Sequence, residues 1–247
     1  AASLGCMIRR LLLCVLAAAA IAGASAQTSP SVNAPRQSLV YYAGAAGRLT
    51  QDRDALGGNP FASALVEVLK REPRTLADFT ALLSAANARH SGGWQQLQFP
   101  KKLPYWRLDD PKPKRVALVL INADYSKSAG VYSLPGAKFD AQRVPEALKA
   151  AGFETTLVLD NDADAARRAI AEFAARSADA DASLIYVGGH GIQYKRVVYW
   201  MMGDYPEQND TWLPTHAIPL DEIGKAGQAR GVNLVLYASC RDDPFLK

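Results

Sequence analysis

His190 and Cys240 are the residues of this chain whose types and placement suit nucleophilic catalysis. Each follows a short apolar run, LIYVGGHG at 184–191 and NLVLYASC at 233–240. A cysteine sulfur attacks carbonyl carbons, and a neighbouring imidazole takes the thiol proton and later returns it. The chain has three Cys and three His, and one of each stands just past a strand-like segment. This pattern predicts a thiol peptidase whose nucleophile and base come from neighbouring strand ends.

The residues beside this pair suggest how a substrate would be held. Gly188, Gly189 and Gly191 surround His190 and permit close approach of a substrate chain. The backbone amides of Gly191 and Cys240 are candidate donors to a developing oxyanion. Arg241 is a candidate to hold the thiolate or to bind a substrate carboxylate, and a solvated loop charge is the equal alternative.

Short apolar strands alternate with helices over residues 115–247. The pattern predicts a doubly wound, mostly parallel α/β sheet flanked by helices. In such a sheet ligands bind beyond the carboxyl ends of the strands, so neighbouring strands would bring His190 and Cys240 together. The expected strands are Val116–Ile121, Glu154–Leu159, Ala182–Val187 and Val232–Tyr237, the expected helices are Ala137–Ala151, Asp164–Arg176 and Pro219–Ala229, and 188–217 is expected to be irregular.

Residues 38–100 form a separate block in the sequence. We expect a strand at Ser38–Tyr42, helices at Pro60–Arg71 and Leu76–Ala88, and a candidate strand at Trp94–Phe99. The following segment, 101–114, carries three Pro and five Lys or Arg, which is typical of a surface linker.

The N-terminus has the pattern of a bacterial-type secretory signal. A basic start at 7–10 precedes an apolar stretch at 11–23 and the small residues Ala24-Ser25-Ala26. We therefore expect a signal peptide at 1–26, a flexible leader at 27–37, and a secreted or periplasmic protein with no membrane association after cleavage. Cleavage would remove Cys6 and Cys14. Cys240 alone cannot form an internal disulfide, so it is either an inert buried residue or a reactive thiol.

Composition and motif content exclude several other functions. The net charge is +4, and Lys and Arg are scattered, which argues against nucleic-acid binding. No Cys-x-x-Cys or His-x-x-x-His spacing occurs, nor a P-loop or a glycine-rich dinucleotide motif after a strand, so we expect no metal and no cofactor. His90 and His216 are expected to be surface residues.

Four segments together resemble the caspase and metacaspase-like cysteine peptidases. The resemblance implies His190 as the proton-transferring partner, Cys240 as the nucleophile of a thioester mechanism, and the Gly191 and Cys240 amides as oxyanion donors. It implies an endopeptidase acting on peptide or protein substrates through a dyad, and no third catalytic residue is evident. The segments are RVALVLINADY at 115–125, LPGAKFDAQRVPEALKAAGFE at 134–154, IYVGGHG around His190 and LVLYASCRDDPF at 234–245.

The block 38–100 is similar to the small subunit of that family, but here it precedes the large-subunit-like block 115–247. SLVYYAGAAGR resembles its first strand, GGNPFASALVEVL its first helix and SGGWQQLQFP its final strand, which in the family is the sixth of the sheet and runs antiparallel at one edge. We interpret this order as a circularly permuted caspase-like fold. Two alternatives stay open, a remnant of a truncated upstream repeat and a segment that completes a neighbouring copy by self-association.

Substrate preference follows only in part from the resemblance. Metacaspases hold a basic side chain with acidic residues; Asp140 matches one of these positions, and Ala238 stands where the other is expected. Asp124 is a candidate to compensate, with a turn or cap role as its alternative. Asp242 and Asp243 are too few oxygens for the calcium site that some metacaspases use. A second hypothesis is a catalytically silent caspase-like binding or scaffold protein, or a truncated fragment.

Overall fold

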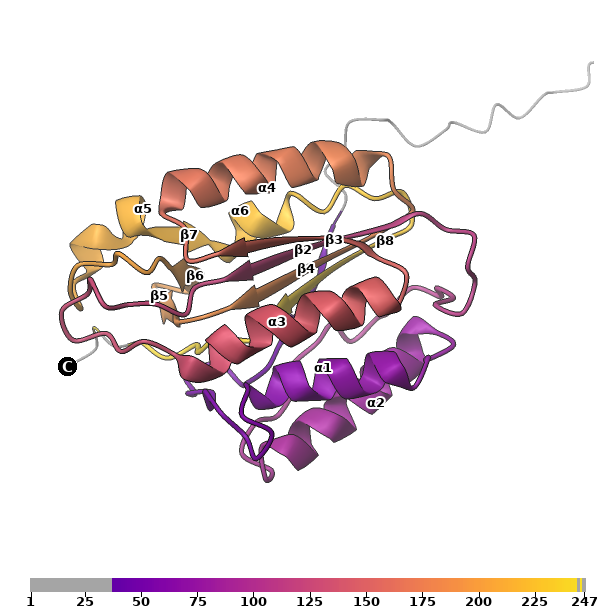
Figure 1. Cartoon of the computed structure of the whole chain (residues 1–247), viewed down its shortest axis with the longest axis horizontal. Helices are drawn as coiled ribbons and strands as arrows, with labels where there is room; N and C mark the ends of the chain where they lie inside the picture. Colours follow the sequence, from indigo (N-terminus) through magenta and orange to yellow (C-terminus); the bar gives the residue numbers. More distant parts are fainter. Residues whose placement is uncertain (1–36, 244, 246–247) are drawn as a thin grey trace, which may run out of the picture. The chain divides into compact units, whose positions relative to one another are not determined.

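A five-stranded parallel sheet lies at the centre of the computed structural model, which describes residues 37–243 and 245 (Figure 1). Its strands are β1 (Leu39–Tyr42), β2 (Arg115–Ile121), β3 (Glu154–Leu159), β4 (Ala182–Gly188) and β8 (Val232–Tyr237). The strand order is β1-β8-β4-β2-β3. The predicted signal peptide and all of the predicted leader except Gln37 lie outside the described residues.

Helices cover both faces of the sheet, which confirms the predicted doubly wound α/β class. One face packs against α1 (Pro60–Lys70), α2 (Leu76–His90) and α3 (Pro135–Ala150), and the other against α4 (Ala163–Ala178) and α6 (Leu220–Gly224) (Figure 1). All seven residues of β4 and all six of β8 are buried, as expected of central strands in a parallel sheet. Among the described residues, no helix is long and apolar enough to cross a membrane.

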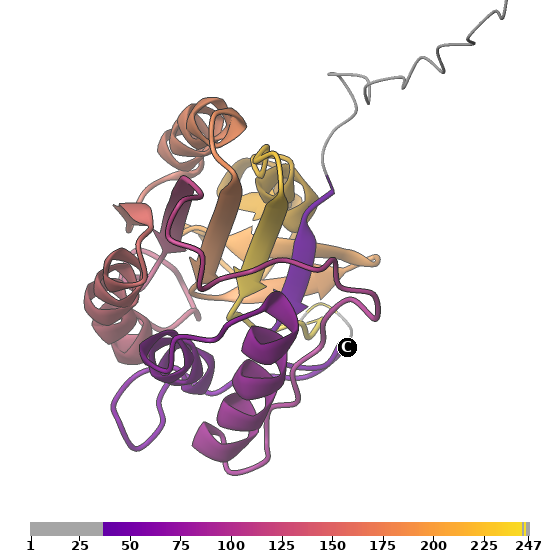
Figure 2. The ribbon, with the colours of Figure 1, turned by 90° about the vertical axis from the view of Figure 1, so that its right-hand side faces the viewer.

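The strand β1 extends the sheet beyond β8 within the same chain (Figure 2). Its register pairs Leu39 with Leu234 and Tyr42 with Tyr237 in a parallel ladder. An antiparallel bridge then joins Tyr42 to Gln98 through two backbone hydrogen bonds of 2.8 and 2.9 Å. This bridge occupies the place of the sixth strand expected at Trp94–Phe99, but only one residue pair forms. The interpretation as a circular permutation stays a prediction.

The prediction of an irregular segment at 188–217 was wrong. A second, antiparallel sheet forms there from β5 (Gly191–Tyr194), β6 (Val197–Met201) and β7 (Ala217–Pro219), with the short helices η1 (Asp210–Trp212) and α5 (Leu213–His216) before β7. The β5–β6 turn is made by Lys195 and Arg196, both at positive φ, 46° and 68°. Asn and Gly are the residues that normally signal such a two-residue turn, so the sequence carried no hairpin signal.

Two further expectations needed correction. The helix expected at Pro219–Ala229 is the short α6, which ends at Gly224. The segment 101–114 is not a free linker, because Trp106 is half-buried against the core and its carbonyl accepts a hydrogen bond of 2.9 Å from the Leu76 amide. The segment therefore ties α2 to the start of β2.

Candidate active site

His190 and Cys240 emerge at the same edge of the sheet. β4 and β8 are hydrogen-bonded neighbours that run parallel, with Val187 opposite Tyr237, so both residues follow the carboxyl ends of adjacent strands. The two residues line two common cavities, one of about 70 Å³ and one of about 310 Å³. The predicted spatial relation of the two strand ends is therefore present.

The sulfur of Cys240 is held by one residue of a distant segment. The backbone amide of Thr50 donates to Sγ at 3.2 Å, and the Thr50 hydroxyl lies 3.4 Å from Sγ. Burial raises the pKa of the Cys240 thiol, while the two contacts from Thr50 lower it because they favour the thiolate. The net pKa lies above the usual value, so the resting residue is a neutral thiol.

The imidazole of His190 is oriented by a backbone carbonyl. Nε2 lies 2.7 Å from the carbonyl oxygen of Tyr132, which can only accept a hydrogen bond, so Nε2 carries the proton. Nδ1 of the neutral ring is then left as the basic nitrogen. Burial lowers the pKa of His190, and the Tyr132 carbonyl, Asp52 and Asp242 act in the opposite direction. The resting pair is thus a neutral thiol and a neutral imidazole.

Tyr125 contacts both the backbone and the ring of His190. Its hydroxyl accepts a hydrogen bond of 2.8 Å from the His190 amide and donates one of 3.1 Å to the Met201 carbonyl. The Tyr125 and His190 rings meet edge to face at a centroid distance of 4.6 Å. Tyr125 is buried, and its two hydrogen bonds link the backbone of His190 to Met201 of β6.

The amide of Gly191 faces the segment that contains Cys240. The Met201 amide donates to the His190 carbonyl at 3.0 Å, so Met201 directs its backbone groups toward β5 and the facing position 190 directs its carbonyl toward β6. In an antiparallel ladder these directions alternate along each strand, so the amides of Gly191 and Gln193 point away from β6. Gln193 accordingly donates to the Asp242 carbonyl at 2.8 Å. The Gly191 amide shares that direction and is free in geometry to bind an oxyanion.

Two carboxylates stand in the smaller cavity. The side chain of Asp140 is 2% exposed, and burial raises its pKa to about 7 against the opposing effect of Arg143, 2.7 Å away. Asp52 lines the same cavity and accepts hydrogen bonds of 3.0 and 3.2 Å from the Gly136 and Ala137 amides at the start of α3. Ala238, the position at which the second acidic residue is expected, also lines this cavity. Asp52 therefore gives the cavity a second carboxylate, from a segment distant from Cys240 in the sequence.

A family model described as Caspase domain matches residues 114–246, more than half of the chain. The chain belongs to the caspase domain family. The match runs from the residue before β2 past Cys240, so it contains both residues of the candidate pair, whereas β1, α1 and α2 lie outside it. Membership places the chain in a family of cysteine peptidases, whose substrates are proteins or peptides. No curated protein matches the chain.

Two other candidate residues of this caspase domain lie away from the common cavities. The Arg241 guanidinium lies 3.8 Å from the centroid of the Tyr42 ring and donates a hydrogen bond of 2.8 Å to the side chain of Gln98. Arg241 therefore links β1 to Gln98, the residue that forms the antiparallel bridge with Tyr42. Asp124 is exposed and accepts a hydrogen bond of 2.9 Å from the Ser126 amide, as a turn residue does. Neither lines a cavity with Cys240.

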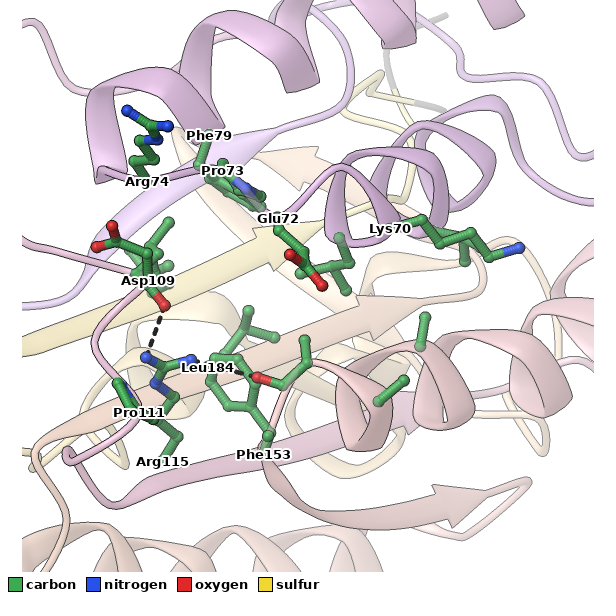
Figure 3. A pocket seen from close by; sticks show the side chains of 18 of the residues that line it. Lys70, Glu72, Pro73, Arg74, Phe79, Asp109, Pro111, Arg115, Phe153 and Leu184 are labelled. Atoms are coloured by element: carbon green, nitrogen blue, oxygen red, sulfur yellow. Dashed lines mark hydrogen bonds between the residues drawn. The ribbon is translucent and has the colours of Figure 1, made fainter.

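A cavity larger than these two lies at the opposite end of the sheet. It measures about 810 Å³ and lies where β2, β3, β4 and β8 begin, with Arg115, Phe153 and Leu184 on its wall (Figure 3). His190 and Cys240 lie at the other end of these strands, so this cavity is not part of the candidate active site. Among the described residues, no group of three or more His, Cys, Asp or Glu is arranged to hold a metal ion.

Sequence reasoning missed Tyr132, Thr50 and Asp52. Tyr132 and Thr50 act through the backbone, at least in part, and a backbone group leaves no mark in residue type. Asp52 sits in a polar loop where an acidic residue is unremarkable. Its position two residues after Thr50 becomes informative only once that loop is known to cross Cys240.

Proposed function

We propose that this caspase domain is a cysteine endopeptidase that uses Cys240 and His190. The observation that carries the proposal is their shared location: adjacent parallel strands deliver both to the same two cavities, with Nδ1 of His190 left unprotonated. A neutral thiol needs a base at the moment of attack, and a neutral imidazole provides one.

The steps follow from these groups. Nδ1 takes the proton of the Cys240 thiol as sulfur attacks the peptide carbonyl carbon. The resulting oxyanion lies within reach of the Gly191 and Cys240 amides. The intermediate collapses to a thioester as His190 gives its proton to the leaving amine. Water then attacks the thioester, His190 takes its proton, and the acid product leaves with the Cys240 thiol restored.

We further propose that the smaller cavity receives a basic side chain of the substrate on the amino side of the cleaved bond. Asp140 and Asp52 both line it, and a Lys or Arg head group would be drawn to these two carboxylates. The apolar stretch at 11–23 supports the accompanying proposal that the enzyme acts in a secreted or periplasmic setting.

The test is cleavage of a fluorogenic peptide library with a varied residue before the scissile bond. We expect turnover of peptides with Arg or Lys there, and a loss of at least about 10³-fold in Cys240→Ala and His190→Ala. His216→Ala is the matched control, because His216 lies on α5 and lines neither common cavity. A folded protein that cleaves no peptide and whose Cys240 thiol does not react with iodoacetamide would instead favour a catalytically silent caspase-like binding protein.

A further inference from the structure

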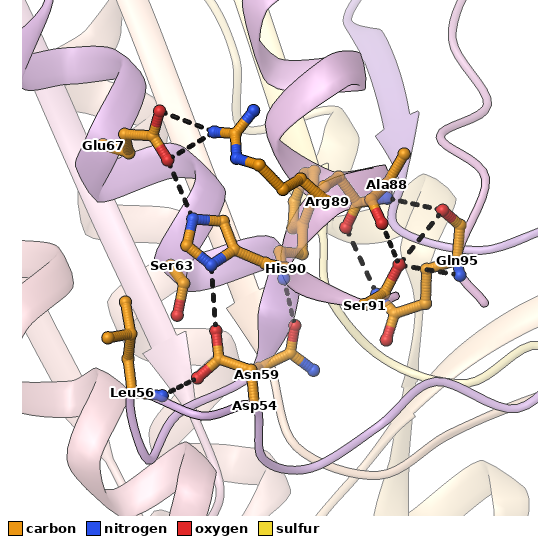
Figure 4. A network of polar contacts seen from close by, with 12 residues as sticks. Asp54, Leu56, Asn59, Ser63, Glu67, Ala88, Arg89, His90, Ser91 and Gln95 are labelled. Carbon is orange, nitrogen blue, oxygen red and sulfur yellow. Dashed lines mark hydrogen bonds and ion pairs between the residues drawn. The ribbon is translucent and has the colours of Figure 1, made fainter. Parts of the chain in front are cut away.

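His90, the last residue of α2, lies between two carboxylates from different elements (Figure 4). Its Nδ1 is 3.4 Å from Asp54 Oδ2, and its Nε2 is 2.9 Å from Glu67 Oε2. The side chains of His90 and Asp54 are only 16% and 1% exposed, which corrects the expectation of a surface histidine. Nε2 is within hydrogen-bond distance of Glu67, whereas Nδ1 faces Asp54 Oδ2 at ion-pair distance, and this buried oxygen has no hydrogen-bond partner among the described residues.

The two carboxylates differ in their other partners. Glu67 also pairs with Arg71 and Arg89, each at 2.7 Å. For Asp54, His90 is the basic side chain within ion-pair distance among the described residues. Asp54 also accepts a hydrogen bond of 2.8 Å from the Leu56 amide at its carboxylate and one of 3.1 Å from the Gly57 amide at its carbonyl, and its own amide donates to the Gly58 carbonyl at 2.8 Å. Loss of the His90 contact would therefore leave Oδ2 of this buried carboxylate facing no nitrogen of a side chain among the described residues.

Asp54 belongs to the segment 43–59, which links β1 to α1 and crosses the candidate active site. Four residues before Asp54, Thr50 contacts the sulfur of Cys240 through its amide and its hydroxyl. Two residues before it, Asp52 lies in the smaller cavity at the start of α3. The position of the segment 43–59 thus determines whether Thr50 contacts the sulfur and whether the carboxylate of Asp52 lies in the smaller cavity.

We infer that His90 is a positioning residue of the active site: it clamps Asp54, and so holds the segment that brings Thr50 to Cys240 and Asp52 to the substrate cavity. The inference rests on the proposed role of Cys240 as nucleophile. His90 touches neither substrate nor sulfur, and it acts through the segment 43–59. A loosened segment donates less to Sγ, so the thiolate becomes harder to form.

Two substitutions of His90 separate its two contacts. The amide nitrogen of Asn stands close to the place of Nδ1, and that of Gln close to the place of Nε2. His90→Asn therefore keeps a donor to Asp54, whereas His90→Gln keeps one only to Glu67. Asp54→Ser removes the same contact from the other side while its hydroxyl can still accept from the Leu56 amide. Arg71→Gln is the matched control, because it removes an ion pair of Glu67 outside the segment.

The readout is the pH midpoint of Cys240 alkylation by iodoacetamide in the folded protein, followed by kcat and KM on a basic peptide. We expect the midpoint to rise by about one pH unit in His90→Gln and Asp54→Ser, which is about tenfold less thiolate below the midpoint. His90→Asn and Arg71→Gln should stay within a few tenths of a unit. KM for the basic peptide should rise in the two shifted variants, because Asp52 loses its place.

Equal midpoints in all four variants would overturn the inference, and so would a shift in His90→Asn as large as that in His90→Gln. If circular dichroism shows that His90→Gln does not fold, Asp54→Ser decides by the same criterion. Alkylation does not depend on peptide cleavage. A protein that shows the expected midpoint shifts but cleaves no peptide would therefore refute the proposed function and leave the clamp in place.

Discussion

Replacement of Gly191 by Ala should abolish most of the activity without removing the catalytic side chains. A Cβ at this position would overlap the hydroxyl of Tyr237 and would lie 2.8 Å from both Cζ of that ring and Cβ of Ser239. Ordinary contacts of a Cβ begin at 3.4 Å. Tyr237 cannot move aside easily, because it is buried and its hydroxyl donates to the Tyr199 carbonyl at 2.8 Å. The backbone of β5 must yield instead.

The expected magnitude follows from that displacement. Clearing the hydroxyl requires a shift of β5 of more than roughly 1 Å, and a misplacement of about 1 Å already costs on the order of 10²-fold in rate. Loss of one oxyanion donor costs about 10²–10³-fold in kcat. We therefore expect kcat to fall by about 10²–10³-fold, with about 1–3 kcal/mol lost from the free energy of unfolding through overpacking.

The assay is steady-state cleavage of the best library peptide, with urea denaturation and Cys240 alkylation measured on the same preparations. Alkylation should persist, because it needs no oxyanion donor. Gly224→Ala is the matched control, since a Cβ there would lie 3.9 Å from Ser38 Cβ and far from the site. A folded Gly191→Ala protein that retains the kcat of the parent enzyme would refute the assignment of the Gly191 amide.

Two other predictions concern pH and stability. Because the pKa of Asp140 is raised from 3.8 to about 7 by burial, the folded state binds a proton that the unfolded state has lost between those pH values. The free energy of unfolding should therefore fall with rising pH across that window by about 1.4 kcal/mol per pH unit from this group. Asp140→Asn should lack this component in urea denaturation at a series of pH values; an unchanged slope would show that Asp140 is ionised throughout. Thr75→Ala should cost about 1 kcal/mol of stability and leave kcat unchanged, because it removes the hydroxyl that accepts a 3.1 Å hydrogen bond from the Asp78 amide, one of the two reciprocal bonds that cap α2.

The sequence predicted most of the elements of the main sheet. The strands at 154–159 and 232–237 have the expected bounds, because short segments rich in β-branched and apolar residues are a local signal. Alternation of such strands with helices then led to the parallel sheet and to a common edge for the candidate pair. The β5–β6 hairpin was missed because its turn residues, Lys195 and Arg196, lack the usual preference for positive φ.

By itself, the sequence determined that one Cys and one His follow strand-like segments, and the motifs around them pointed to the caspase domain. Only the tertiary structure determined what surrounds the pair: the Tyr132 carbonyl on His190, Thr50 on the sulfur and the clamp of His90 on Asp54. The physical reason is one of range. Strands and helices are predicted from the types of neighbouring residues, whereas these contacts join segments that are far apart in the chain. The contacts of Thr50 and Asp54 exist because β1 is paired with β8, which brings the segment 43–59 across the end of the sheet, and Tyr132 reaches His190 from the loop between β2 and α3.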